Sequence, residues 1–157
     1  MQTDCKLIFK NLNKKDIKKI NLLKIVNDIS SLKYDPKLEN ISTLKSNLTD
    51  IFFNNGFILD KNLGSTHLKI NGIKHKTGLA IQTGNAARFY ADVLKLQWLY
   101  EEKKINNVIY VCLSKNSVKN SYLSNLINSE RAEREINFFD KIIKVPILLI
   151  EIDFLNT

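Results

Sequence analysis

The sequence predicts a mixed α/β fold in which helices cover both faces of a central sheet. Two predominantly apolar runs, residues 107–113 and 145–152, have the length of strands and are typical of buried strands. Residues 73–113 predict a strand, a long helix and a second strand in succession. A crossover of this kind requires parallel neighbours, so we expect part of the sheet to be parallel.

The first third of the chain is predicted to be helical. Residues 14–33 carry apolar side chains at helical spacing, and Asp35-Pro36 interrupts the pattern. Residues 37–54 predict a second amphipathic helix, which Gly56 ends. The apolar positions are Ile17, Ile20, Leu23, Ile25 or Val26, and Ile29 in the first helix, and Leu38, Ile41, Leu44, Leu48, Ile51 and Phe52 in the second.

After residue 65 the pattern changes to alternation. Residues 66–71 and 73–82 are predicted to form two short strands, or one bent pair, on either side of Gly72. A long helix follows over residues 86–104, with Asn85 as its N-cap. Beyond the strand at 107–113, residues 117–128 and 130–142 predict helices, and the strand at 145–152 has Pro146 near its start.

Length and composition exclude several classes of protein. A chain of 157 residues predicts one domain, 1–157, with a helical N-terminal part over 1–56. The hydrophobic fraction of 44% argues against a disordered chain, and no run approaches the ~18–20 apolar residues of a membrane span. The first residues do not resemble a secretory signal, and Cys5 and Cys112 form no zinc motif. We therefore expect a cytoplasmic protein.

The positive charge lies mainly in the first half of the chain. The formal net charge is +8, of which residues 1–80 carry +7 and residues 81–157 carry +1. Such asymmetry indicates a surface that binds a polyanion, most commonly a nucleic acid. A solvated lysine-rich helix such as KKDIKK is an equally good explanation of the charge alone.

The candidate site lies at residues 78–88, GLAIQTGNAAR. Here a predicted strand ends in Thr-Gly-Asn and opens a helix. Free backbone N–H groups and the positive helix end can hold a phosphate at such a turn. Most glycine-containing turns between a strand and a helix, however, are only turns, and this remains the simpler interpretation.

A family resemblance adds to these observations. The block GLAIQTGNAARFYADVLKLQWLYEEKKINNVIYV resembles the core of the BglII/BstYI family of type II restriction endonucleases, whose members carry a Q-x-G-N-like segment and then a K-L-Q-like stretch. The later segment SERAEREINFFDKIIKVPILLIEID resembles that family's closing helix and strand. The resemblance covers residues 66–153, and it implies a restriction-endonuclease-like catalytic core of the PD-(D/E)XK type.

The resemblance also implies a magnesium-dependent site. In this superfamily an Asp and a Glu on adjacent strands hold Mg²⁺, which activates water and stabilises charge on the scissile phosphate. By position, Gln82 falls on the third catalytic site, which helps to place the water. Ala80 falls on the glutamate and Asn71 on the aspartate, so both expected metal ligands are absent. Binding of Mg²⁺ is therefore doubtful in this sequence.

Three explanations of the missing acids stay open. The natural sequence carries acids at positions 71 and 80 that were changed on purpose, or the chain is a natural pseudonuclease that binds DNA without cutting it. A third explanation is a shifted register in which Asp60 supplies the first acid, although this would not restore the glutamate.

Four further residues are candidates for contact with DNA. Lys74 and Lys76 could meet phosphates or form a solvated strand face, and Gln82 could bind a phosphate or simply end a strand. Asn85 is first of all a helix cap, with DNA contact as a second role. Arg88 lies in the first helical turn, where a cation opposes the helix dipole, so a phosphate or an acidic partner would stabilise it.

The resemblance implies the following function. The chain would bind double-stranded DNA as a homodimer on a short palindromic site, because a two-fold protein matches a two-fold sequence. It would be a type II restriction endonuclease that is inactive with Asn71 and Ala80 in place, with a methyltransferase as a possible partner. The alternative is a natural non-cutting DNA-binding protein or regulatory subunit. A remoter one is an RNA-binding or protein-interaction module on the same fold.

Overall fold

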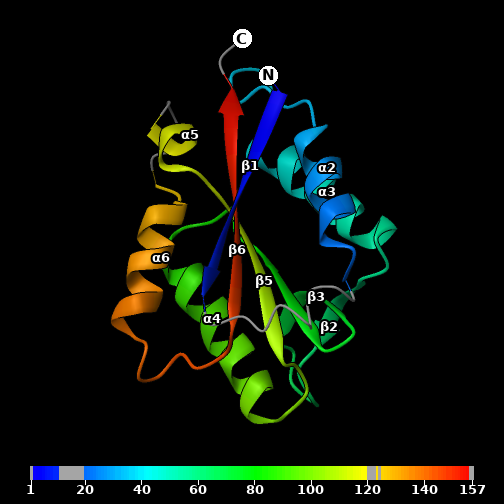
Figure 1. Cartoon of the computed structure of the whole chain (residues 1–157), viewed down its shortest axis with the longest axis vertical. Helices are drawn as coiled ribbons and strands as arrows, with labels where there is room; N and C mark the ends of the chain where they lie inside the picture. The colour runs from blue at the N-terminus through cyan, green and yellow to red at the C-terminus, as the bar shows by residue number, and fades with distance from the viewer. Residues whose placement is uncertain (1, 11–19, 120–122, 124, 156–157) are drawn as a thin grey trace.

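The computed structural model describes residues 2–10, 20–119, 123 and 125–155. Within them lies one six-stranded mixed sheet of order β1-β6-β5-β4-β3-β2 (Figure 1). Its strands are β1 (Gln2–Lys10), β2 (Ile58–Asn62), β3 (Lys69–Lys74), β4 (Thr77–Ile81), β5 (Asn107–Leu113) and β6 (Ile147–Leu155). The helices are α2 (Leu22–Ser30), α3 (Ile41–Asn54), α4 (Ala86–Glu101), α5 (Lys115–Lys119) and α6 (Ser129–Phe138). The predicted mixed α/β fold is therefore confirmed.

The centre of the sheet is parallel and its flanks are antiparallel. Strand β5 pairs in parallel with β4 on one side and with β6 on the other. All residues of β4 and β5 are buried, as the continuous apolar run of β5 predicts. Helix α4 connects β4 to β5, so the predicted parallel crossover is confirmed, and its N-cap is Asn85 as expected.

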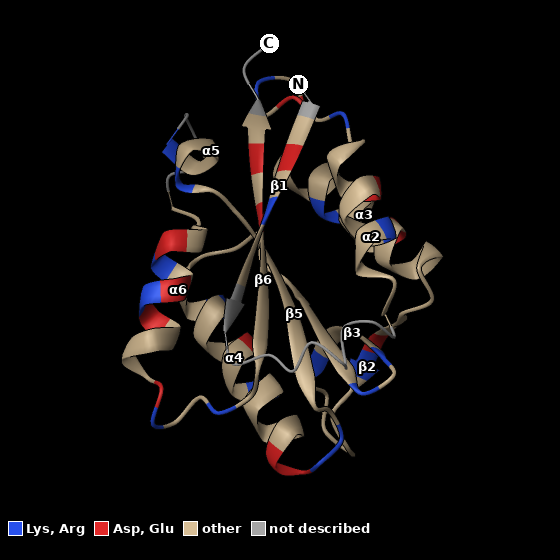
Figure 2. Cartoon of the chain, in the orientation of Figure 1, with Lys and Arg blue, Asp and Glu red and all other residues tan. Residues whose placement is uncertain are grey.

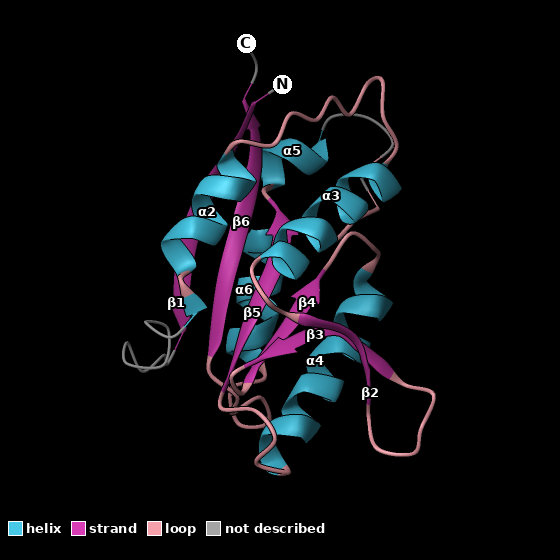
Figure 3. Cartoon of the chain, turned by 90° about the vertical axis from the view of Figure 1, so that its right-hand side faces the viewer, coloured by secondary structure: helices cyan, strands magenta, loops and turns pink. Residues whose placement is uncertain are grey.

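Helices cover both faces of the sheet. Helices α2 and α3 bury Ile25, Leu44 and Phe52 against one face, and α4 and α6 bury Phe89 and Ala132 against the other. Figure 1 views the sheet nearly edge-on, with α2 and α3 on its right and α4 and α6 on its left. Figure 3 shows α3 lying over the strands and β2 and β3 as a projecting hairpin. Among the described residues, no helix is long and apolar enough to cross a membrane.

The sequence did not predict the two strands at the edges of the sheet. Strand β1 pairs with β6 in antiparallel fashion, so that Gln2 lies opposite Leu155. It carries only a short alternation, and its partner is at the other end of the chain. Strand β2 is largely exposed, so it lacks the apolar pattern that marks a strand.

The predicted break at Gly72 is wrong. Strand β3 runs through Gly72, and the chain reverses at His75 and Lys76, between the paired residues Lys74 and Thr77. Both turn residues have positive φ, +43° and +60°. A two-residue hairpin loop needs this conformation because its twist then matches that of the strands.

The predicted helices are longer than those observed. Helix α2 falls within the predicted range 14–33, of which residues 14–19, including Ile17, lie outside the described residues. Leu23 and Leu38, expected on buried faces, are 73% and 85% exposed. Helix α5 has five residues instead of the predicted 117–128, of which 120–122 and 124 lie outside the described residues. Helices α3 and α6 begin and end within four residues of the predicted ranges.

We expect Leu48→Ala to destabilise the protein far more than Leu38→Ala, although both leucines belong to the predicted apolar pattern. Leu48 is 1% exposed and Leu38 is 85% exposed. A buried Leu→Ala change costs about 2–5 kcal/mol, whereas an exposed one costs less than about 0.5 kcal/mol. Urea unfolding of the two variants measures the difference, and equal losses would contradict the observed packing of α3.

Candidate functional site

A pocket of ≈ 250 Å³ opens beside the ends of β3 and β4. Its walls come from α3, β2, β3, the exit of β4 and the first turns of α4. Of the residues that the sequence singled out, Asn71, Gln82 and Arg88 line this pocket, and so does Asp60. Ala80, Lys74, Lys76 and Asn85 are not among the lining residues.

The pocket exists because β3 and β4 part at Asn71. Ladder pairing between the two strands ends at Gly72 and Leu79. Beyond that point the Ile81 N–H donates a hydrogen bond of 2.8 Å to Asn71 Oδ1. The Asn71 side chain thus takes the place of a backbone acceptor for the Ile81 N–H, and the bond fixes the oxygen end of the Asn71 amide toward β4. Among the described residues, Asn71 Nδ2 has no hydrogen-bond partner.

Gln82 holds the turn that follows β4. Its side chain is buried, with 3% exposure. Oε1 accepts a hydrogen bond of 2.7 Å from the Gly84 N–H, and Nε2 donates one of 3.3 Å to the Tyr110 hydroxyl. Burial raises the pKa of Tyr110 well above its usual value, so this hydroxyl stays protonated. Gln82 therefore acts within the protein as a bridge between the turn and β5.

Ala80 lies in the core behind the pocket. It is 2% exposed and pairs with Tyr110 across β4 and β5. Tyr110 and Phe89 belong to the same apolar cluster as Ala80, and their rings are in edge contact with centroids 5.7 Å apart. Position 80, where the family resemblance implies a glutamate, therefore lies within an apolar cluster.

The turn before α4 places Arg88 at the pocket. The Asn85 side chain accepts a hydrogen bond of 3.2 Å from the Arg88 N–H, so its predicted role as a helix cap is confirmed. A Cβ on Gly84 would lie 2.6 Å from Arg88 Cδ, so glycine gives the arginine room to lie against the turn. Arg88 forms no ion pair with any carboxylate of the described residues.

Neither of the two lysines predicted to contact DNA lines the pocket, although Lys74 lies on β3. Lys74 Nζ donates a hydrogen bond of 2.6 Å to the carbonyl oxygen of Asn55, at the C-terminal end of α3. A cation stabilises the free carbonyls of a helix end, so Lys74 has a structural partner. Lys76 is exposed in the hairpin turn.

Four charged lining residues, Lys45, Lys69, Asp92 and Lys95, were not predicted from the sequence. Lys95 forms a 2.6 Å ion pair with Asp92 and donates a hydrogen bond of 2.8 Å to the carbonyl oxygen of Lys69. Arg88, Asp92 and Lys95 are spaced by four and three residues, which places them on one helix face, and this signal could have found them. Lys45, on α3, and Lys69, at the start of β3, come from segments whose patterns give no sign of the site.

Asp60 carries the one carboxylate of the pocket lining that has no ion-pair partner among the described residues. It lies opposite Asn71 in the register of β2 and β3, but Asp60 and Asn71 are not themselves a pair, whereas the residues on either side of them are. Its φ of +48° is the left-handed conformation, which Asp and Asn tolerate better than most residues. The side chain is exposed at the pocket.

The residues of this pocket do not fit a divalent metal ion. Asp60 is the single unpaired carboxylate, and Asp92 is paired with Lys95. The oxygens of Asn71 and Gln82 already accept backbone N–H bonds. No group of three or more His, Cys, Asp or Glu side chains within the described residues could hold a metal. The lining carries four cations and two carboxylates, so it favours an anion.

The K-L-Q stretch has a structural role. Gln97 is buried, and its Oε1 accepts hydrogen bonds from the backbone N–H groups of Lys144 and Val145, at 2.8 and 2.9 Å. Its Nε2 donates to Glu101 at 2.6 Å. Gln97 therefore ties α4 to the segment that enters β6.

Comparison with known proteins identifies relatives of the chain. The family model described as restriction endonuclease BglII/BglIII matches residues 12–152. A crystal structure of the restriction endonuclease BglII with a DNA 16-mer is similar, with a TM-score of 0.72 and 13% identity over 97% of this chain and 77% of that one. Free BglII is similar with a TM-score of 0.59 and 16% identity over 100% and 81% of the two chains. No curated protein matches the sequence.

Proposed function

The chain belongs to the BglII/BglIII restriction endonuclease family, and we propose that it binds double-stranded DNA without cleaving it as its sequence stands. The family and the fold support a DNA-binding nuclease function in general. The observation that carries the finer proposal is the pocket at the ends of β3 and β4. Its lining includes Asn71 and Gln82, two of the positions at which the family resemblance expects the site, yet it holds a surplus of cations and no pair of free carboxylates.

The distribution of charge supports a DNA surface around this pocket. Lys45, Lys69 and Arg88 approach it from three separate elements, α3, β3 and α4. Figure 2 shows basic residues near β2 and β3, whereas α6 carries acidic and basic residues side by side. Lysine and arginine on phosphates supply most of the affinity of such contacts and set the register of the protein on the duplex. Lys76, exposed in the hairpin, would reach a neighbouring phosphate.

The absence of cleavage follows from the chemistry of the site. Members of the family generally use Mg²⁺, a hard ion that prefers carboxylate oxygens. Asn71 has an amide in place of the expected carboxylate, and Ala80 has no polar atom. Without these anions nothing compensates the cost of drawing a divalent ion from water into a pocket rich in cations.

Two kinds of protein fit this proposal, a restriction enzyme whose metal-binding acids were replaced on purpose and a natural pseudonuclease. One observation favours the natural pseudonuclease. The surroundings of both positions suit the uncharged residues. Ala80 is buried in an apolar cluster beside Tyr110, and the Asn71 oxygen satisfies the backbone N–H of Ile81. Such a protein would act as a DNA-binding or regulatory subunit. A partner methyltransferase would be expected for the restriction enzyme but not for the pseudonuclease. Either protein would work on DNA in the cytoplasm.

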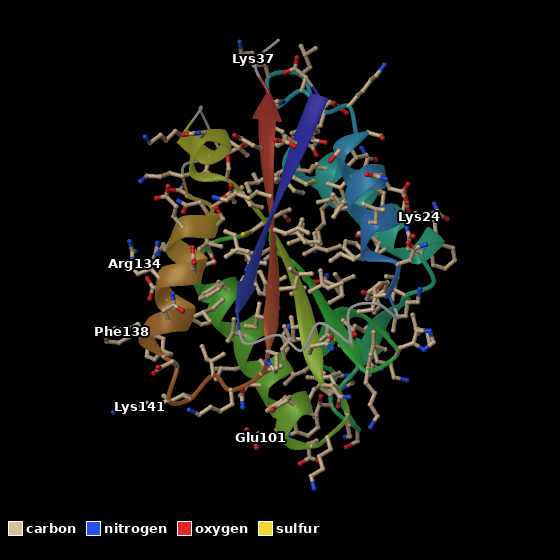
Figure 4. The ribbon with its side chains drawn as sticks, viewed as in Figure 1. Lys24, Lys37, Glu101, Arg134, Phe138 and Lys141 are labelled. Atoms are coloured by element: carbon tan, nitrogen blue, oxygen red, sulfur yellow. The ribbon has the colours of Figure 1, made fainter. Side chains whose placement is uncertain are left out.

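We further propose that the DNA-bound form is a homodimer that pairs through the outer faces of α4 and α6. Tyr90, Leu94 and Trp98 are exposed and follow one another at four-residue spacing along α4. Phe138 and Ile142, on α6 and just beyond it, are exposed too, and Figure 4 shows Phe138 pointing away from the protein. An apolar surface of this kind is typical of an interface, and a two-fold dimer matches a palindromic site.

Binding to duplex DNA should weaken steeply with salt, and Arg88→Ala should reduce that dependence. Each phosphate contact contributes about −0.9 to the slope of log affinity against log salt concentration, so the slope should fall in magnitude by about 1. Fluorescence anisotropy over a salt series measures it. Lys37→Ala, in the exposed turn between α2 and α3 and labelled in Figure 4, is the control and should leave the slope unchanged. A flat salt dependence with no binding of duplex DNA would refute the proposal.

The unchanged chain should give no fragments from mixed plasmid and phage DNA with Mg²⁺. The Asn71→Asp, Ala80→Glu double variant separates the two candidates. Discrete fragments from that variant alone would support a restriction enzyme whose metal site was removed. If the variant is silent while it remains folded by circular dichroism and still shifts duplex DNA, the pseudonuclease is supported. Fragments from the unchanged chain would contradict the proposal itself.

Trp98→Glu should convert the homodimer into a monomer, because a charge would then be buried at the proposed interface. Sedimentation equilibrium measures the mass of the species. Leu23→Glu is the matched control, since Leu23 is exposed on α2, which covers the opposite face of the sheet. A monomeric mass for the unchanged chain, both free and on DNA, would overturn the dimer.

A further inference from the structure

We infer that the pocket beside Asn71 binds a phosphodiester oxyanion directly, through lysine, arginine and amide N–H groups, with no divalent ion between protein and phosphate. The inference rests on the proposed binding of DNA and names the group that this pocket would take from it. It applies to the pocket lined by Lys45, Asp60, Lys69, Asn71, Gln82 and Arg88.

The first argument is the direction of the Asn71 amide. Its oxygen accepts the Ile81 N–H at 2.8 Å, and an N–H donor can be satisfied only by the oxygen end. The NH₂ end therefore remains without a partner among the described residues, at a position that lines the pocket. At a position where a carboxylate would offer oxygens to a cation, this residue offers hydrogen-bond donors to an anion.

The second argument is the balance of charge. The Asp92 carboxylate lies 2.6 Å from Lys95 Nζ, so these two residues neutralise each other. Of the remaining charges in the lining, Lys45, Lys69 and Arg88 are positive and Asp60 is negative. None of the three cations forms an ion pair with another described residue. The field in the pocket thus attracts a monoanionic phosphodiester and repels a divalent cation.

The third argument comes from the turn that leads into α4. Thr83 and Gly84 line the pocket just before this 16-residue helix begins. Partial positive charge gathers at a helix N-terminus, and an anion beside it is stabilised. The helix adds to the attraction already provided by the three cations, and its direction would be unfavourable for a metal ion.

Asp60 makes the inference testable, because removing its charge should change the affinity for an anion and the affinity for a metal ion in opposite directions. If the pocket binds an anion, the Asp60 carboxylate repels it, and Asp60→Asn should strengthen binding. If the pocket binds a metal ion, Asp60 would be its one free carboxylate ligand, and the same change should abolish binding. Asparagine tolerates the left-handed conformation at φ +48°, so the variant should fold.

The experiment titrates inorganic phosphate, and separately duplex DNA, into the full chain with EDTA present and then with MgCl₂. Affinity comes from the NMR shifts of the Asn71 side-chain amide and of the Gly84 N–H. We expect binding in EDTA, binding about three- to tenfold tighter for Asp60→Asn, and weaker binding by a similar factor for Lys45→Ala. Asp4→Asn, an exposed carboxylate on β1, is the matched control and should change nothing.

Three results would overturn the inference. Shifts that require MgCl₂, or that disappear in Asp60→Asn, would assign the pocket to a metal ion. Binding of duplex DNA that leaves both amide signals unmoved would refute the phosphate site and leave the proposed DNA-binding function standing. Failure to bind duplex DNA at all would refute the proposed function as well, even if inorganic phosphate shifts the two signals.

Discussion

The hydrogen bond from the Ile81 N–H to Asn71 Oδ1 is the interaction on which the candidate site depends. Strands β3 and β4 separate beyond Gly72 and Leu79, and an unpaired backbone donor beside the buried centre of the sheet would be costly. One side-chain oxygen satisfies that donor and allows the strands to part. The same bond turns the amide nitrogen outward and removes an oxygen from use as a metal ligand. The opening of the sheet and the polarity of the pocket therefore have one cause.

A second consequence concerns the space behind the pocket. With alanine at position 80, Tyr110 packs in the core beside it, and the Tyr110 hydroxyl accepts a hydrogen bond from Gln82 Nε2. Gln82 in turn holds the Gly84 N–H and so shapes the turn that carries Arg88. The uncharged residue, the buried tyrosine and the arginine are thus linked through Gln82. A carboxylate introduced at position 80 would have to be accommodated by all of them.

Sequence reasoning succeeded where the physical signal is local. Strand β5 and helix α4 were predicted because burial on both faces gives a continuous apolar run and because a long helix shows its period. Strand β1 was missed because its pairing with β6 joins opposite ends of the chain, which no local pattern records. The hairpin turn was misplaced because His75 and Lys76 adopt positive φ without the glycine or asparagine that usually signals it.

The candidate site was predicted in part, for the same reason. Asn71, Gln82 and Arg88 belong to neighbouring segments that the turn and the hairpin bring together. Lys45 lies on α3, and only the packing of that helix against the sheet brings it to the pocket.

The pairing of β1 with β6 also bears on how the protein folds. An edge strand made early stays unpaired until β6 has been made. Contacts between distant segments slow folding, and an unpaired strand invites association in the meantime. The excess of positive charge over residues 1–80 helps to keep chains in this state apart, because like charges repel.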